Sequence, residues 1–98
     1  MSVSKNASGL RNLFGVTPRK FALLKEAMEE AGIREADLEE KYFSASTRGG
    51  QRANKAETGV ILRHRPTGTL VRCRKTRSRA LNRYYARKIL AQRLRERR

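Results

Sequence analysis

Hydrophobic and polar positions follow a helical period in the first part of the chain. Between residues 18 and 31 the apolar residues recur three or four positions apart, which predicts an amphipathic helix. Thr17 can cap this helix, Pro18 suits its first turn, where a missing N–H is harmless, and Gly32 suits its end. We interpret its apolar stripe as core or as a docking face, and the stripe consists of Phe21, Leu24 and Met28.

The pattern changes to the short period of β-strands further along the chain. Residues 58–65 and 69–74 are rich in β-branched and apolar residues, and the turn residues 66–68 between them predict a hairpin of two central strands. The second strand alternates apolar and basic residues, so one face can pack while the other stays hydrated. These two faces carry Val71 with Cys73 and Arg72 with Arg74.

The acidic stretch 33–40 precedes a third predicted strand, over residues 40–44, with Tyr42 among its inward-facing residues. The carboxylates of this stretch are Glu35, Asp37, Glu39 and Glu40. We interpret them as a solvated approach to the strand that also balances nearby arginines. A pair of carboxylates for hydrolysis is the alternative, but such mechanisms need a defined separation, which the sequence does not provide.

The last predicted element is a basic helix that begins with Thr76 or Ser78 as its cap and runs to the end of the chain. Leu81, Tyr85 and Ile89 are spaced four residues apart, which predicts that they lie on the sheet, with Tyr84 beside them. Stacking of the two tyrosines on bases is an alternative, but aromatic residues at helical spacing are typical of a core.

Together these elements predict an α+β fold: a small mixed β-sheet with a central hairpin packed on the C-terminal helix, and an additional N-terminal helix. The 98 residues suit one small domain with a modest core. We expect residues 1–16 to form a flexible basic leader, 17–32 the N-terminal helix, and 33–98 the domain itself. The leader is acid-free, as in a mitochondrial transit peptide, but it lacks a sustained amphipathic pattern, which favours a bacterial leader.

The charge of the chain is large and unevenly placed. Its 24 basic and 9 acidic residues give a net charge of +15. Residues 58–98 hold fourteen Lys or Arg against Glu96 alone, whereas the first 57 residues are nearly balanced. A field of this size attracts polyanions. RNA, DNA or an acidic membrane surface would fit, and a solvated basic face without a ligand is the remaining alternative.

The residue counts exclude several chemistries. Cys73 is the single cysteine, so an internal disulfide is excluded, and its place in the strand indicates a small buried side chain. His64 is the single histidine, so we expect no metal site and no other cofactor, and we expect His64 to pack or to bind RNA. Asp37 and His64 lie in unrelated contexts, which disfavours a Ser-His-Asp triad. The sequence has no apolar run of membrane-spanning length, so we expect no segment to cross a membrane, and a membrane is not among the partners that we expect.

The remaining candidate chemistry lies in a loop over residues 44–55. Gly49 and Gly50 can take backbone angles closed to other residues and let another molecule's backbone come close. Gln51 adds a backbone N–H and a polar side chain at their end. A turn that only joins two elements is the alternative explanation, but the motifs around this loop favour a functional one.

These motifs follow one another in a characteristic order: the Gly49-Gly50-Gln51 (GGQ) loop, Asn54-Lys55, the hairpin, Thr76-Arg77-Ser78 and Asn82-Arg83. From about residue 38 to residue 94 this order resembles the catalytic domain of bacterial and organellar class I peptide chain release factors. It most resembles their small stand-alone relatives, which rescue stalled ribosomes without reading a codon. The resemblance implies that residues 33–98 are a release-factor-like catalytic domain with the loop at one end of its sheet. It also implies that the separate codon-reading domain of full-length release factors is missing here.

The resemblance further implies a ribosome-dependent, codon-independent peptidyl-tRNA hydrolase. In the family, the backbone N–H of the glutamine stabilises the charge that develops on the ester oxygen when water attacks, as a preorganised donor can. Carried over by position, this residue is Gln51, whose side chain helps to exclude other nucleophiles and is an expected methylation site. Gly49 and Gly50 let the loop enter the peptidyl transferase centre. Because tRNA and ribosomal RNA complete the site, no internal base is expected.

The partners implied by the resemblance are the ribosome, through its large subunit and peptidyl transferase centre, peptidyl-tRNA and ribosomal RNA. A glutamine methyltransferase and a second rescue factor are further expected partners. We expect a monomer in the bacterial cytoplasm, with the mitochondrial matrix as the alternative. The RNA-facing candidates are basic and polar residues of the loop, the hairpin and the C-terminal helix: Arg48, Arg52, Asn54, Lys55, Arg63, Arg65, Arg72, Arg74, Lys75, Arg77, Arg79, Arg83, Arg87, Lys88 and Arg93.

The sequence departs from the family in two places. The family loop usually reads Gly-Pro-Gly-Gly-Gln or Gly-Ala-Gly-Gly-Gln, but Thr47-Arg48 precede the glycines here, which stiffens the loop and adds a cation. Codon-independent relatives usually carry a long basic tail, for which this chain offers residues 93–98, so a split large subunit that holds peptidyl-tRNA is a candidate target. The alternative function is a non-catalytic ribosome-binding or RNA-binding protein that has lost hydrolytic activity.

Overall fold

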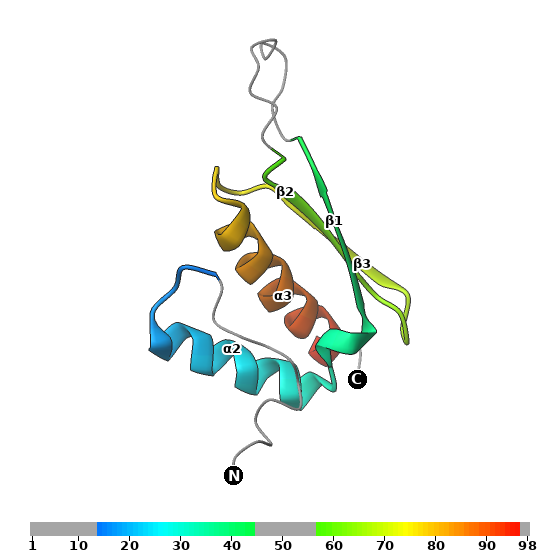
Figure 1. The fold of residues 1–98 in the computed structure, drawn as a ribbon. Coiled ribbons are helices and arrows are strands. Elements are labelled where there is room, and N and C mark those ends of the chain that lie inside the picture. The colour runs from blue at the N-terminus through cyan, green and yellow to red at the C-terminus, as the bar shows by residue number, and fades with distance from the viewer. Residues whose placement is uncertain (1–13, 45–56, 97–98) are drawn as a thin grey trace.

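The computed structural model describes residues 14–44 and 57–96, which form three layers (Figure 1). The elements are α2 (Pro18–Ala31), the 3-10 turn η1 (Glu35–Asp37), β1 (Leu38–Phe43), β2 (Gly59–His64), β3 (Thr69–Cys73) and α3 (Arg79–Glu96). Helix α3 lies in the middle and packs on β2 and β3 on one side and on α2 on the other.

Local contacts set the two ends of α2, and both ends lie where the sequence predicted them. The Oγ1 of Thr17 accepts a hydrogen bond from the N–H of Lys20 at 3.2 Å, which satisfies one of the amides that a helix start leaves unpaired. Gly32 has a φ of 77°, so it ends the helix in the left-handed conformation that suits glycine. The predicted apolar stripe belongs to the core, with Leu24 and Met28 buried and Phe21 half-buried.

The strands form one sheet in the order β1-β2-β3, and both neighbouring pairs are antiparallel. The α+β class is confirmed, but the expected mixed pairing is wrong for the described strands, because each strand turns back on the one before it. The predicted hairpin of two central strands is also corrected: among the described strands β2 is central, and β3 lies at an edge. The hairpin turn closes through Gly68, whose φ is 75° and whose N–H donates to the carbonyl of His64 at 2.7 Å.

Strand β1 begins at Leu38, earlier than the predicted residue 40. Glu39 and Glu40 are therefore strand residues, which pair with Arg63 and Leu62 of β2. Directly opposite residues share a face of the sheet. Glu40 thus lies on the same face as the buried Leu62, toward α3, whereas Glu39 lies on the outer face.

The core lies between the sheet and α3 and continues to α2. Cys73 is 2% exposed and has a free thiol, which confirms the prediction of a small buried side chain. The predicted contact stripe of α3, Leu81, Tyr85 and Ile89, is half-buried, and its members Tyr85 and Ile89 pack against the core. The buried positions spread further round the helix because the sheet and α2 cover it from two sides; they are Asn82, Tyr84, Ala86, Arg87, Leu90, Ala91 and Leu94.

Helix α3 begins after Ser78, which was one of its two predicted caps. The Oγ of Ser78 accepts a hydrogen bond from the N–H of Leu81 at 3.1 Å. Thr76, the other candidate, instead stabilises the preceding turn, where its Oγ1 accepts from the N–H of Ser78 at 2.9 Å. Within the described ranges, no helix has the combined length and apolarity that crossing a membrane would require.

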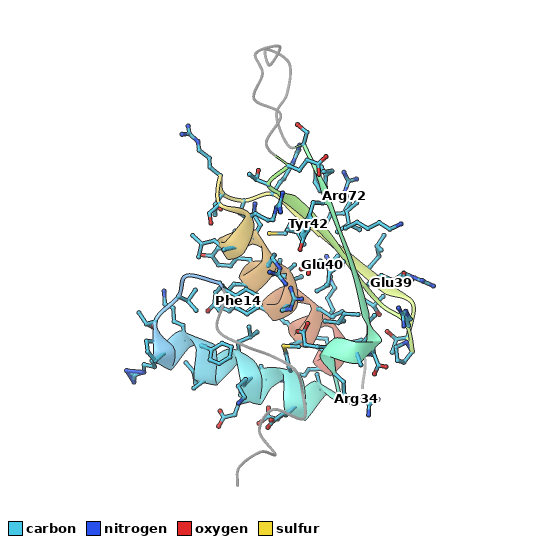
Figure 2. All side chains as sticks on the ribbon, in the orientation of Figure 1. Phe14, Arg34, Glu39, Glu40, Tyr42 and Arg72 are labelled. Atoms are coloured by element: carbon cyan, nitrogen blue, oxygen red, sulfur yellow. The ribbon has the colours of Figure 1, made fainter. Side chains whose placement is uncertain are left out.

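Phe14 belongs to the core, although it lies in the segment expected to be a leader. It is 1% exposed, and its ring centroid is 6.4 Å from that of Phe21. Figure 2 labels Phe14 between α2 and α3. The guanidinium carbons of Arg83 and Arg87 lie 5.4 and 5.3 Å from its ring centroid. The described core therefore includes a residue that precedes α2 and packs against α3.

Candidate nucleic-acid interface

The predicted catalytic loop connects β1 to β2, and its central residues lie outside the described ranges. They are Arg48, Gly49, Gly50, Gln51, Arg52, Asn54 and Lys55. The residues that flank them are described: Phe43, at the end of β1, pairs with Gly59, at the start of β2. The loop therefore starts and finishes at one end of the sheet. We call residues 42–44 and 57–59 the loop end.

Five exposed cations lie near the loop end. They belong to β3, to the connection after it and to the start of α3, and they are Arg72, Arg74, Lys75, Arg77 and Arg79. Two of them lie over aromatic rings of β1. The guanidinium carbon of Arg72 is 5.0 Å from the ring centroid of Phe43, and that of Arg79 is 4.2 Å from the ring centroid of Tyr42. Figure 2 labels Arg72 and Tyr42 at this end of the sheet. Positive charge is thus concentrated beside the loop end, where it suits a phosphate backbone.

Arg63 lies toward the opposite end of β2, Arg65 directly follows that strand, and the two share one carboxylate. The Nη1 of Arg63 donates to Oε1 of Glu39 at 2.8 Å, and the Nε of Arg65 is 3.5 Å from Oε2 of Glu39. The hydrogen bond from Arg63, together with the nearby positive charges, holds the pKa of Glu39 below its usual 4.5. Both arginine side chains are about half exposed, so these ion pairs are weak and leave the guanidinium groups accessible.

Arg87 does not face solvent, and its assignment as an RNA-facing residue is wrong. It is 1% exposed. Its Nε and Nη2 donate to the two carboxylate oxygens of Glu35 at 2.8 and 3.0 Å, and its Nη1 donates to Oε2 of Glu40 at 2.7 Å. A buried guanidinium needs such neutralisation. Glu35 and Glu40 therefore balance an internal charge, and they are not the solvated approach that the sequence suggested.

Arg83 completes this group, which we call the Arg87 cluster (Glu35, Glu40, Arg83 and Arg87). The Nε of Arg83 donates to Oε2 of Glu40 at 3.0 Å. Burial would raise the pKa of Glu40, but the hydrogen bonds and charges of the two arginines outweigh it and lower the pKa below 4.5. Burial would likewise lower the pKa of Arg87, but its hydrogen bonds to the two glutamates raise it. Glu40 and Arg87 thus stay charged at neutral pH.

The remaining candidates on α3 are exposed. The Nη1 of Arg93 donates to the carbonyl of Leu70 at 3.0 Å, and the Nζ of Lys88 is 5.7 Å from the ring centroid of Tyr84. Tyr84 is 6% exposed and packs edge-on against Tyr85, with 5.2 Å between ring centroids. Tyr84 is therefore a core residue, as its helical spacing favoured.

His64 is buried beside the hairpin turn, which confirms that it packs. It is 3% exposed, and its Nδ1 is 3.0 Å from Oγ1 of Thr67. Burial lowers the pKa of His64 below its usual 6.5, although the nearby Asp37 opposes this shift. In the part of the chain that the structure describes, no three His, Cys, Asp or Glu residues come together to hold a metal ion.

Asn82 has a structural role at the loop end that its sequence context did not predict. Its side chain is fully buried, and its Nδ2 donates to the carbonyls of Thr58 at 2.7 Å and Thr76 at 3.0 Å. Its Oδ1 accepts from the N–H of Thr76 at 3.0 Å. Asn82 thus ties the start of β2 to the turn before α3. One feature of the sequence could have indicated this role. Asn82 precedes Ala86 and Leu90 by four and eight residues, so it lies on the same buried face of α3, where a side-chain amide needs hydrogen-bond partners.

Comparison with known proteins identifies the family. The family model of the RF-1 domain matches residues 26–98. The chain belongs to the RF-1 domain family. The RF-1 domain match begins within α2 and includes the whole sheet, the candidate loop and α3. The predicted resemblance to class I release factors is thereby confirmed.

Three proteins illustrate what this RF-1 domain chain is similar to. The mitochondrial translation release factor in rescue of Danio rerio is 44% identical over 70 residues, or 71% of this chain and 45% of that protein. The Homo sapiens protein of the same name is 39% identical over 79 residues, or 81% of this chain and 48% of that protein. Peptide chain release factor 1 of Caldicellulosiruptor saccharolyticus is 47% identical over 74 residues, or 74% of this chain and 21% of that protein. The chain thus spans less than half the length of each of these relatives.

Proposed function

We propose that the chain is a ribosome-dependent peptidyl-tRNA hydrolase that frees nascent chains from stalled ribosomes or split large subunits without reading a codon. The observation that carries the proposal is the Gly49-Gly50-Gln51 sequence inside the RF-1 domain match, joined to two paired strand ends beside exposed cations. Release without codon reading is supported by the relatives named as acting in rescue. The chain covers 45% and 48% of them but 21% of release factor 1.

The proposed reaction is hydrolysis of the ester between the peptide and its tRNA. Water attacks the ester carbonyl carbon, negative charge develops on the carbonyl oxygen, and the backbone N–H of Gln51 donates to that oxygen. Gly49 and Gly50 allow close approach to the tRNA end because they carry no side chain. The tRNA and ribosomal RNA supply the other groups of the site. His64 cannot serve as a base here, because it is buried near the hairpin turn.

Exposed cations anchor the domain on RNA in this proposal. Those beside the loop end in the fold are Arg72, Arg74, Lys75 and Arg77, and those farther from it are Arg63, Arg65, Lys88 and Arg93. Each phosphate contact releases counterions, so affinity should fall steeply with salt concentration. The relatives include mitochondrial and bacterial proteins, and either the mitochondrial matrix or the bacterial cytoplasm would supply the proposed ribosomes.

A non-catalytic ribosome-binding protein is the second candidate function. The feature that favours it is Thr47-Arg48, which replaces the first two residues of the usual family loop. A loop stiffened at Thr47 would bring the Gln51 N–H to the ribosome without the geometry that hydrolysis needs. The exposed cations serve RNA binding equally well under both functions.

Release of labelled peptide from stalled ribosomes, and from split large subunits that hold peptidyl-tRNA, distinguishes the two functions. Gln51→Pro lacks the amide hydrogen and should slow release by about 100- to 1,000-fold while binding persists. Gln51→Gly keeps that hydrogen and is the matched control. Wild-type protein that binds but releases nothing would refute hydrolysis, and release gained by Thr47→Gly would then locate the defect in the loop. Affinity that is insensitive to salt would contradict the RNA-facing assignment.

A further inference from the structure

The first turn of α3 contacts both chain segments that lead to the candidate loop. The Nε of Arg79 donates to the carbonyl oxygen of Glu57 at 2.9 Å, and its guanidinium carbon lies 4.2 Å from the ring centroid of Tyr42. Glu57 is the first described residue after the loop, and Tyr42 is in β1 before it. One side chain therefore links the two sides of the loop end to the same helix.

Asn82 extends this link to the next residue. Its buried Nδ2 donates to the carbonyl of Thr58 at 2.7 Å, and the same amide group is held by the backbone of Thr76. The carbonyls of Glu57 and Thr58 are thus both bound by side chains of α3, from its first residue and from one turn further along. Two adjacent peptide groups held by one rigid helix have little freedom to tilt.

The outer face of the loop end is closed by an aromatic ring. A Cβ built on Gly59 would lie 2.6 Å from Cε1 and Cε2 of Phe43, so the ring rests directly on the glycine backbone. Arg72 lies over this ring, as Arg79 lies over Tyr42 on the other face. Each of the last two residues of β1 is therefore covered by an arginine from a different element.

We propose that Arg79 is a positioning residue, which sets the direction in which the loop leaves the sheet, and that it is not an RNA contact. The catalytic consequence rests on the proposed function. Helix α3 also carries exposed cations that would meet RNA, so the contacts of Arg79 and Asn82 couple the RNA-bound helix to the loop. Misplacement of reacting groups by about 1 Å can cost about 100-fold in rate, which makes such anchoring consequential.

Arg79→Lys separates geometry from charge. Lysine keeps the positive charge, but it lacks the planar guanidinium and the Nε donor. With stalled ribosomes limiting and the protein in excess, the saturating rate of release should fall about 10-fold, with little change in the half-saturating concentration. Tyr42→Leu should have the same effect, and Tyr42→Phe, which keeps the ring, should not.

Two control variants complete the test. Arg77→Gln should instead raise the half-saturating concentration, because it removes an exposed charge. Arg19→Lys is the same chemical change at an exposed position of α2 and should leave both quantities unchanged.

Amide hydrogen exchange provides a readout that does not depend on catalysis. Exchange over residues 42–44 and 57–60 should be faster in Arg79→Lys than in wild type, and unchanged in Arg19→Lys. Unchanged exchange there in Arg79→Lys would overturn the proposal whether or not the wild type releases peptide. If Arg79→Lys instead kept the saturating rate of the wild type but had a raised half-saturating concentration, Arg79 would be an RNA contact. An inactive wild type would refute the proposed function alone, and faster exchange in Arg79→Lys would still support the positioning role.

Discussion

Replacement of Arg87 by methionine tests the energetic weight of the Arg87 cluster. The Arg87 side chain is 2% exposed, and those of its partners Glu35 and Glu40 are 21% and 14% exposed. Methionine is of similar length and carries no charge. The substitution therefore leaves two carboxylates beside an apolar side chain, with Arg83 still bound to Glu40.

The expected loss of stability follows from this burial. Removal of one partner of a buried ion pair costs about 3–5 kcal/mol, because the other partner stays desolvated without compensation. Part of each carboxylate reaches water and Arg83 remains, so we expect the lower end, about 3 kcal/mol. A domain of 98 residues has a total free energy of unfolding of about 5–15 kcal/mol. The variant should therefore lose a large part of its stability.

Urea unfolding at neutral pH, followed by far-UV circular dichroism, measures this loss. Arg63→Met is the matched control, because Arg63 also binds a glutamate at 2.8 Å but its side chain is 48% exposed. Exposed pairs of this kind contribute about 0–1 kcal/mol. Adding Glu35→Gln to Arg87→Met should recover part of the loss, since Glu35 then carries no charge in place of its lost partner, while Glu40 keeps Arg83. Equal losses in Arg87→Met and Arg63→Met would refute the reasoning that burial sets the strength of the cluster.

Three further predictions concern other buried or crowded positions. His64 should make the fold sensitive to mild acid: burial holds its pKa below 6.5, so the unfolded chain binds the proton first and the free energy of unfolding should fall as the pH drops below about 6.5. In urea unfolding, His64→Phe should reduce this dependence of the free energy of unfolding on pH. An unchanged pH dependence would show that other groups cause it. Gly59→Val should cost about 1–3 kcal/mol because its side chain meets the Phe43 ring; equal costs in the wild-type and Phe43→Ala backgrounds would disprove this clash. Asn82→Ala leaves two carbonyls and an N–H without their side-chain partner and should cost about 2–3 kcal/mol, against about 1 kcal/mol for the cap variant Ser78→Ala. Thermal unfolding that ranks these two variants the other way would contradict the role of Asn82.

The ends of α2 and of the hairpin were predictable because local contacts set them. Thr17 caps α2 through an amide three residues away, and Gly32 and Gly68 supply left-handed backbone that few other residues adopt. The burial of Cys73 followed from strand alternation in the same way. The burial pattern of α3 was predicted less well, because it depends on cover by both the sheet and α2.

The roles of the arginines in the candidate site were not predictable from their spacing. Arg77, Arg79 and Arg87 look alike in a basic stretch, but Arg77 is exposed, Arg79 holds Glu57, and Arg87 is buried. The groups that separate them lie far away in sequence: Glu57 is 22 residues from Arg79, and Glu35 is 52 residues from Arg87. Local pattern carries no information about partners at such distances.

The sequence by itself determined the ends of α2 and the hairpin turn, the concentration of positive charge in the second half, and the motifs that mark the RF-1 domain family. Only the tertiary structure decided which arginines are available to a phosphate, which one neutralises internal carboxylates, and which one holds the backbone beside the loop. The physical reason is that caps and turns are completed by neighbours along the chain. Burial and charge pairing arise instead where distant segments meet.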